Sequence, residues 1–310
     1  MDLLAIKNAM ASVEENHSVL IYGPPKSGKT RLVASAALIP EIENIYWHDN
    51  ENGYHTILSM DLPDWALAKI KLFRYPDTRT NPIAIETMLK IFSAKTPVTI
   101  CDQHGKVNCV ACRTGNTFQG TPFSLGTCTH KDLVVIDSGS QLGDSALNSA
   151  CIGQDVTYKA TFDDYGASGK YLADILSVIQ QCHNTNFIVI THELVDEEVI
   201  NGVKKDRIFP LMGTKTFSRK VAKYFGTVVY THMKLGKHAA GSSSTYKTET
   251  LTGSRVGAVL EKSKEPCMAD ILVAGGIIKS SIGDSTATEQ SSPPEKVVPK
   301  KPGLVLPGKK

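Results

Sequence analysis

The segment 23–30 has the sequence Gly-Pro-Pro-Lys-Ser-Gly-Lys-Thr and fits G-x-x-x-x-G-K-[ST], the pattern of a phosphate-binding loop. A short apolar run at 18–22 precedes the loop and predicts a buried strand, and the Ala- and Leu-rich stretch 31–38 predicts a helix. The pattern requires a strand, a glycine loop and a helix in this order. The sequence therefore predicts a site for the phosphates of a nucleotide.

The residue types in this loop suit that chemistry. Gly23 and Gly28 let the backbone curl so that successive N–H groups point at phosphate oxygens, and the helix adds the positive end of its dipole. We expect Lys29 to reach the β- and γ-phosphates and the Thr30 hydroxyl to ligate Mg²⁺. The alternative is a Gly/Pro turn that only precedes a helix. The predicted nucleotide-binding residues are Gly23, Pro24, Pro25, Lys26, Ser27, Gly28, Lys29, Thr30 and Arg31.

An acidic segment, Asp-Asn-Glu-Asn-Gly at 49–53, follows the predicted second strand at 44–48. In a parallel sheet this strand end lies close to the phosphate loop, where α/β enzymes place ligands and catalysts. We predict that Glu51 orients or deprotonates the water that attacks the γ-phosphate. The alternative is a solvated turn, because these residue types also favour turns.

Two later strands are predicted to end at the same edge. The buried apolar run at 133–136 is followed by Asp137, which we expect to hold the Mg²⁺ shell. The predicted strand 186–190 ends in Thr-His-Glu, and either Thr191 or His192 is predicted to sense the γ-phosphate. The alternative for His192 is a hydrogen-bonded histidine at a strand end with no role in sensing.

Cysteines and histidines gather at 101–130, where Gly, Thr and Asn are frequent and periodicity is weak. Tetrahedral Zn²⁺ takes Cys and His ligands, often in C-x2-C pairs, and a metal would order a long insertion without secondary structure. The predicted zinc ligands are Cys101, His104, Cys109 and Cys112, with Cys128 and His130 as alternates. The other interpretation is a flexible insertion whose thiols are incidental.

The remaining helices, strands and loops are predicted from the spacing of apolar residues. We expect a helix at 1–16, a short helix and a mobile loop over 139–168, and a helix from about 168 to 183. Antiparallel strands at 228–231 and 246–251 are expected to complete the sheet. The basic segment 194–220 either follows a nucleic-acid backbone or is a solvated charged hairpin.

Two features are expected near the C-terminus. Arg255 lies on a predicted turn and is the candidate for an arginine that reaches a neighbouring subunit's nucleotide, with Lys262 and Lys264 in reserve. Residues 283–310 are rich in Pro, Ser and Lys and predict a disordered tail after a folded domain at 1–282.

Bulk properties narrow the class of protein. The chain has 310 residues, a formal charge of +3 and seven cysteines. The charge is too small to indicate nucleic acid by itself. No apolar run reaches the ~18–20 residues of a membrane span. An N-terminus without a signal-type apolar core and an odd cysteine count favour a cytoplasmic protein with reduced thiols.

Taken together, these motifs resemble the RecA-like ATPases. The matching parts are the loop 23–30, the pair Asp49 and Glu51 after a strand, LVVIDS at 133–138 and FIVITHE at 187–193. They are closer still to the bacteriophage ATPases of the Sak type, small RecA-like proteins linked to single-strand annealing and recombination. The resemblance covers about 17–262. Thr-His stands where RecA proteins carry a glutamine sensor, and the Cys/His insertion is not part of that core.

The resemblance implies a fold and a function. The fold is an α/β P-loop NTPase core with a mostly parallel central sheet flanked by helices, a Cys/His insertion and a C-terminal β extension. The function is Mg²⁺-dependent ATP hydrolysis on single-stranded DNA, with Lys29, Glu51, Asp137, Thr191 or His192, and Arg255 in the site. Expected partners are single-stranded DNA, further copies in a ring or filament, and a single-strand-binding protein or annealase. The rivals are a hexameric helicase-type motor, a nucleotide-gated DNA-binding module with little turnover, and a small-molecule kinase.

Overall fold

The computed structural model describes residues 17–155, 157–182, 184–200, 203–241, 248–254 and 267–278, which all belong to one compact unit, Met1–Lys279. The predicted helix at 1–16, Arg255, Lys262, Lys264 and the predicted tail at 283–310 lie outside the described residues.

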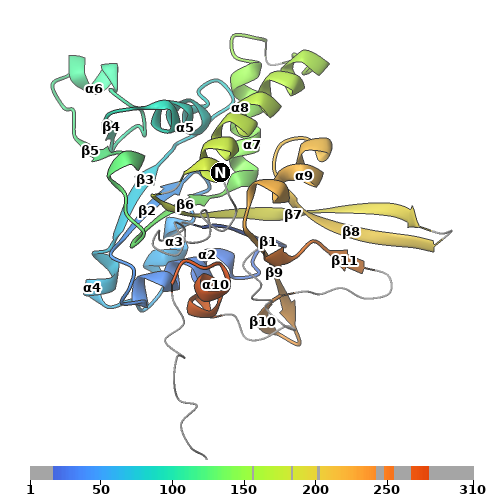
Figure 1. Ribbon diagram of the computed structural model, residues 1–310. Coiled ribbons are helices and arrows are strands. Elements are labelled where there is room, and N and C mark those ends of the chain that lie inside the picture. Colours follow the sequence, from blue (N-terminus) through green and yellow to red (C-terminus); the bar gives the residue numbers. More distant parts are fainter. Residues whose placement is uncertain are drawn as a thin grey trace, which may run out of the picture. The chain divides into compact units, whose positions relative to one another are not determined.

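A mostly parallel sheet forms the centre of this unit, in the order β10-β9-β1-β7-β6-β2-β3 (Figure 1). Neighbouring strands from β9 to β3 are parallel, and β10 is antiparallel to β9. The prediction of a mostly parallel sheet flanked by helices is therefore confirmed. The strands of this path are β1 (Ser18–Gly23), β2 (Asn44–Asp49), β3 (Ile70–Arg74), β6 (Asp132–Asp137), β7 (Asn186–Ile200), β9 (Thr227–Lys234) and β10 (Lys237–Ala240).

Helices cover both faces of the sheet and bury a separate apolar cluster on each (Figure 1). One face carries α5 (Ile83–Ser93), α7 (Gly139–Ala150) and α8 (Phe162–Gln181). The other carries α2 (Lys29–Ala34), the 3-10 helix Ser35–Leu38, α3 (Tyr54–Leu58), α4 (Asp64–Leu67) and α10 (Met268–Ala274). β1 and β6 are buried along their whole length because they lie between these layers.

Two predicted boundaries on this framework are wrong. The helix expected from about residue 168 begins at Phe162, because Thr161 and Asp164 form a capping box in which each side chain accepts the other's backbone N–H. The strand expected to end at residue 190 continues to Ile200, so Thr191 and His192 lie inside β7. The strands expected at 228–231 and 246–251 are antiparallel in the prediction, whereas β9 pairs parallel with β1 and antiparallel with β10, and the described strand within 246–251 does not pair with β9.

The extension of β7 pairs antiparallel with β8 (Val203–Leu211) and forms a long arm that leaves the sheet (Figure 1). Strand β11 (Thr248–Thr250) pairs parallel to β8, and β12 (Gly253–Ser254) pairs antiparallel to β9. Helix α9 (Lys215–Val221) and the 3-10 helix Ala222–Tyr224 follow the arm.

Carboxylates pair with most of the basic side chains of this arm and of α9. Lys204 pairs with Glu197 at 2.9 Å, and Arg207 pairs with Glu198 at 3.0 Å. Lys215 and Arg219 both contact Asp196, and Lys205 lies 3.7 Å from Glu249. Of the two interpretations of segment 194–220, the geometry favours the charged hairpin over a surface that follows phosphates.

The Cys/His insertion has secondary structure of its own, contrary to expectation. β4 (Val98–Cys101) and β5 (Gly120–Phe123) form a two-stranded antiparallel sheet, and α6 (Val110–Thr114) and the 3-10 helix Leu125–Thr127 accompany it. We call residues 98–123 the Cys/His module.

Among the described helices, none is long and apolar enough to cross a membrane.

Candidate active site

The phosphate loop joins β1 to α2, as the motif predicts. Thr231 of β9 lies so close to Gly23 that a Cβ there would come within 2.1 Å of its carbonyl oxygen. Gly28 has φ +88°, which also favours glycine. The Lys29 ammonium donates to the carbonyl oxygens of Gly23 and Pro24, at 2.9 and 2.8 Å. Burial lowers the pKa of Lys29 to about 8, although the carboxylates of Glu51 and Asp137 act in the opposite direction.

Thr30 and Asp137 meet on the floor of the site, where the Thr30 hydroxyl donates to Asp137 Oδ2 at 3.0 Å. Asp137 is 2% exposed, and this burial raises the pKa of its carboxyl to about 7, with the nearby charges of Asp49 and Glu51 acting in the same direction. A buried carboxylate beside a hydroxyl, with no ion pair to a cationic side chain among the described residues, is the oxygen donor set that Mg²⁺ takes in P-loop NTPases. The residues present therefore fit the ion.

Glu51 lies across the pocket from this pair. Its Oε1 accepts a hydrogen bond of 2.7 Å from Nε2 of His192 on β7. Burial raises the pKa of the Glu51 carboxyl, but hydrogen bonds with His192 and Ser138 and the charge of Lys29 together lower it by more. The pKa of Glu51 is therefore below its ordinary value. Glu51 is thus held as a carboxylate, the form that can orient or accept a proton from water.

Asp49, the other member of the acidic pair, shapes the loop that carries Glu51. Its carboxylate accepts the backbone N–H groups of Glu51, Gly53 and Tyr54, at 3.1, 2.9 and 2.9 Å. The geometry confirms the turn interpretation of this segment, and the catalytic role of Glu51 stays a prediction. Asp49 makes the turn, and the turn presents Glu51.

The structure separates the two candidate sensors. His192 lines the pocket beside Glu51. Thr191 is fully buried, its methyl group faces Gly139 of α7, and its hydroxyl has no partner among the described residues. Alternation along β7 explains the difference, because successive side chains point to opposite faces.

These groups border one pocket of about 400 Å³ at the C-terminal ends of β1, β2 and β6, beside the middle of β7. Most predicted residues line it: Lys26, Gly28, Lys29, Thr30, Arg31, Glu51, Asp137 and His192. Pro24 and Ser27 support the loop from behind. Pro24 accepts from Lys29, and the Ser27 hydroxyl bonds that of Thr231 at 2.8 Å.

Two residues at the site were missed from the sequence. Asn50 is buried and its Oδ1 accepts the backbone N–H of Ser138, which ties the Glu51 loop to the end of β6. His238 of β10 lines the pocket, and its Nδ1 donates to the Ser27 carbonyl at 2.9 Å. Asn50 lies within the acidic segment, but nothing in the local sequence of His238 indicates that β10 folds back onto the phosphate loop.

The four predicted zinc ligands come together in the Cys/His module. One ligand atom from each of Cys101, His104, Cys109 and Cys112 lies within 4.8 Å of the others. The pairs formed by His104 Nδ1 with the three sulfurs span 3.2–3.8 Å. Ligands at the corners of a tetrahedral Zn²⁺ site are about 3.6–3.8 Å apart, so donor type and spacing both fit zinc.

The alternates lie elsewhere. Cys128 packs in the main core, its thiol donates to the Ser124 carbonyl, and burial raises its pKa to about 12. The backbone carbonyl of His130 accepts a hydrogen bond from the Asn186 side chain. Cys128 and His130 are both outside the metal-type cluster found among the described residues.

Comparison with known families agrees with this site. The model of the AAA domain family matches residues 15–256. The chain belongs to the AAA domain family. The matched range includes the phosphate loop, the Glu51 loop, Asp137 and His192, which all border the described pocket.

Solved structures with a similar fold include the RadB recombinase, with a TM-score of 0.36 and 14% identity over 79% of this chain and 90% of that one. An ATPase from the type III secretion system of pathogenic bacteria matches with a TM-score of 0.42 and 11% identity, over 71% of this chain and 53% of that one. The flagellar accessory protein FlaH from Methanocaldococcus jannaschii matches with a TM-score of 0.36 and 10% identity, over 86% of this chain and 93% of that one. Among curated proteins no match to the chain is found.

Proposed function

We propose that the protein hydrolyses ATP with Mg²⁺ and uses the reaction to act on single-stranded DNA in recombination, annealing, repair or replication. One observation carries the ATPase part. Lys29 and Thr30 begin the helix after β1, Glu51 follows β2 and Asp137 ends β6, and all four border the same pocket. Phosphoryl transfer to water requires this set: a cation and N–H groups for the phosphates, oxygen ligands for the metal, and a carboxylate for the water.

Each group has a defined task in this proposal. The ammonium of Lys29 exchanges its bonds to the Gly23 and Pro24 carbonyls for bonds to phosphate oxygens. Thr30 and Asp137 would hold Mg²⁺, which would supply neutralisation of the phosphate charge. Glu51 receives the proton of the attacking water, and His192 holds that carboxylate in place.

The ATPase part is tested by changing Lys29. Lys29→Ala removes the cation for the phosphates, so ATP binding weakens and steady-state hydrolysis is lost. Lys90→Ala, an exposed lysine on α5, is the matched control and keeps both. Equal hydrolysis by the Lys29 variant and the parent would contradict the proposal.

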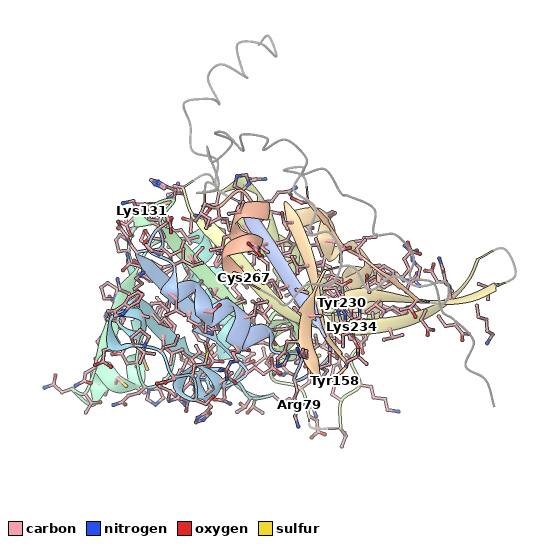
Figure 2. The ribbon with its side chains drawn as sticks, turned by 90° about the horizontal axis from the view of Figure 1, so that it is seen from below. Arg79, Lys131, Tyr158, Tyr230, Lys234 and Cys267 are labelled. Atoms are coloured by element: carbon pink, nitrogen blue, oxygen red, sulfur yellow. The ribbon has the colours of Figure 1, made fainter. Side chains whose placement is uncertain are left out.

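The DNA part is supported by the hairpin of β9 and β10, whose tip lies next to the nucleotide pocket through His238. Lys234 and Lys237 are exposed there, beside exposed Met233 and Leu235 (Figure 2 labels Lys234). The lysines of the β7–β8 arm are paired with carboxylates, as described above. The β9–β10 hairpin is therefore the better candidate for contact with phosphates.

The test is ATP hydrolysis with and without single-stranded DNA across a salt series. We expect DNA to stimulate hydrolysis, and the stimulation to fade as salt rises because phosphate contacts release counterions. Lys234→Ala with Lys237→Ala removes the stimulation, whereas Lys204→Ala, in the ion-paired arm, keeps it. Absence of stimulation at every salt concentration would eliminate the DNA proposal and leave the ATPase intact.

We also propose self-association into a ring or filament, in which Arg255 reaches the nucleotide of a neighbouring copy. Arg255 follows β12 directly in the chain, and β12 pairs with β9 of the nucleotide-bearing sheet. Sedimentation with ATP and single-stranded DNA tests the assembly. An Arg255→Ala variant that binds ATP normally but hydrolyses it slowly is the expected result, and an unchanged rate would contradict this role.

A further inference from the structure

The Cys/His module packs an aromatic side chain, Phe123, against β2, the strand that leads into the Glu51 loop. Phe123 of β5 is 3% exposed, and its ring centroid lies 4.9 Å from that of Tyr46, 5.2 Å from His48 and 5.6 Å from Phe73. Tyr46 and His48 belong to β2, the strand that ends at Asp49. Figure 1 shows β4, β5 and α6 grouped at the side of the sheet formed by β2 and β3.

The metal-ligand loop also touches the end of β3. Gly105 follows the ligand His104, and a Cβ at Gly105 would lie 2.3 Å from the carbonyl oxygen of Arg74 and 2.8 Å from Cδ1 of Tyr75. The Gly105 carbonyl accepts a hydrogen bond of 2.8 Å from the Thr87 hydroxyl on α5. The loop is thus packed closely against the protein at its ligand-bearing turn.

Tyr75 connects this contact to the Glu51 loop. Its hydroxyl forms a 2.6 Å hydrogen bond with Nδ1 of the fully buried His48. Its backbone N–H donates to the carbonyl oxygen of Asp49 at 2.9 Å. Asp49 in turn holds the backbone of Glu51, so consecutive contacts run from the metal-type cluster to the predicted catalytic carboxylate.

Ile100 and Phe123 anchor the strands of the module in the main apolar core, but its ligand-bearing part is small. Its strands are four residues each, and an isolated two-stranded sheet is marginally stable. The thiols of Cys101, Cys109 and Cys112 form their own buried cluster, apart from the main core. A bound metal contributes its binding free energy directly to the folding of such a small unit.

We propose that Zn²⁺ bound by Cys101, His104, Cys109 and Cys112 holds the module against the ends of β2 and β3 and so positions Glu51 for hydrolysis. The metal lies outside the nucleotide pocket and does not touch the reacting atoms. Its loss is expected to slow the catalytic step and to leave ATP binding nearly unchanged, because the phosphate loop belongs to β1 and α2. This inference rests on the proposed ATPase function for its kinetic consequence only.

The first experiment measures metal content and needs no enzymatic activity. Elemental analysis of the parent is expected to give about one zinc per chain, and substitution with Co²⁺ is expected to give thiolate-to-cobalt charge-transfer absorption. The double variant Cys109→Ser, Cys112→Ser loses both signals. Cys267→Ser, at the exposed start of α10 (Figure 2), keeps them. Less than about half an equivalent of zinc in the parent would overturn the site.

The second experiment tests the connection to the Glu51 loop by hydrogen exchange, again without activity. In the chelator-treated protein, peptides covering 46–54 are expected to exchange at least about tenfold faster than in the zinc-loaded protein, while peptides covering 17–30 stay unchanged. Equal exchange at 46–54 in the two forms would overturn the positioning role even if zinc binds.

The third experiment separates binding from catalysis. Phe123→Leu retains the metal ligands and much of the apolar volume, so it is expected to bind zinc and ATP like the parent. Its kcat is expected to fall about tenfold, because a weakened contact with β2 lets the Glu51 loop shift from its position. A parent-like kcat in this variant would count against the proposal. If the parent itself hydrolyses no ATP, the proposed function fails, and the metal-content and exchange experiments decide the inference.

Discussion

The carboxylate of Glu51 and the imidazole of His192 form a 2.7 Å hydrogen bond that joins the loop after β2 to the middle of β7. The two side chains are 38% and 27% exposed at the nucleotide pocket. This bond uses one of the two oxygens of the carboxylate that we propose to activate water. His192 is therefore in a position to orient Glu51 and to respond when a nucleotide fills the pocket.

Replacing His192 by Ala removes this contact without touching the phosphate loop. We expect the Kd for ATP to stay within about twofold and kcat to fall about tenfold, since only an interaction that acts in the transition state is lost. Nucleotide binding and steady-state hydrolysis measured on the same preparation check the result. Equal losses in binding and turnover would show that His192 supports the pocket as a whole.

A substitution at the neighbouring residue, Thr191, is expected to stabilise the protein. Thr191→Val removes a buried hydroxyl that has no partner among the described residues and keeps the shape of the side chain. We expect unfolding to become less favourable by about 1 kcal/mol, because an unsatisfied buried polar group costs roughly that much. Hydrolysis is expected to be unchanged. Chemical denaturation gives the stability, and a destabilised variant would indicate a hydrogen bond to Thr191.

The contact of His238 with the phosphate loop predicts a dependence on one donor group. His238→Ala removes the Nδ1–H bond to the Ser27 carbonyl, so ATP binding is expected to weaken several-fold, roughly 1 kcal/mol. His238→Asn places an amide N–H near the position of Nδ1 and is expected to restore most of the affinity. Isothermal titration with ATP checks both variants, and equal Kd values for Ala and the parent would exclude this role.

The buried His48 predicts loss of stability in acid. Burial lowers its pKa to about 3, against an ordinary value of 6.5. Below pH 6.5 the unfolded chain takes up a proton that the folded protein refuses until about pH 3, so the free energy of unfolding decreases as pH falls through this window. The slope from this one group approaches about 1.4 kcal/mol per pH unit.

A matched pair of variants isolates that slope. His48→Phe with Tyr75→Phe removes the titrating ring and its hydrogen-bond partner together, so the decrease between pH 6 and pH 4, roughly the middle of the window, is expected to become shallower. His55→Gln, an exposed histidine on α3, leaves the slope as in the parent. Identical pH profiles for the double variant and the parent would contradict the assignment to His48.

Local patterns predicted the parts of the fold whose signal is local. The phosphate loop, the apolar run before Asp137 and the acidic turn after β2 each need only a few consecutive residues, and the parallel sheet brings them to one edge. The start of α8 was missed because Gly166 and Gly169 obscured its helical pattern, whereas Thr161 and Asp164 supply the actual cap.

The remaining differences depend on contacts between distant segments. Whether β9 lies parallel or antiparallel to β1 depends on the path of the chain between them, which periodicity does not encode. The arm of β7 continues because β8 pairs with it, although residues 193–198 are mostly charged. His238 reaches the phosphate loop only because β10 pairs with β9. The same holds for Phe123 beneath β2.

The most direct test of the account is hydrolysis by Glu51→Gln, which keeps the size of the side chain and removes its capacity to accept a proton. Steady-state ATP hydrolysis and ATP binding are measured for this variant, the parent and Glu41→Gln, an exposed control that precedes β2. We predict that kcat falls at least about a hundredfold in Glu51→Gln alone, with ATP affinity preserved. Turnover equal to that of the parent would contradict the assignment of Glu51 as the catalytic carboxylate.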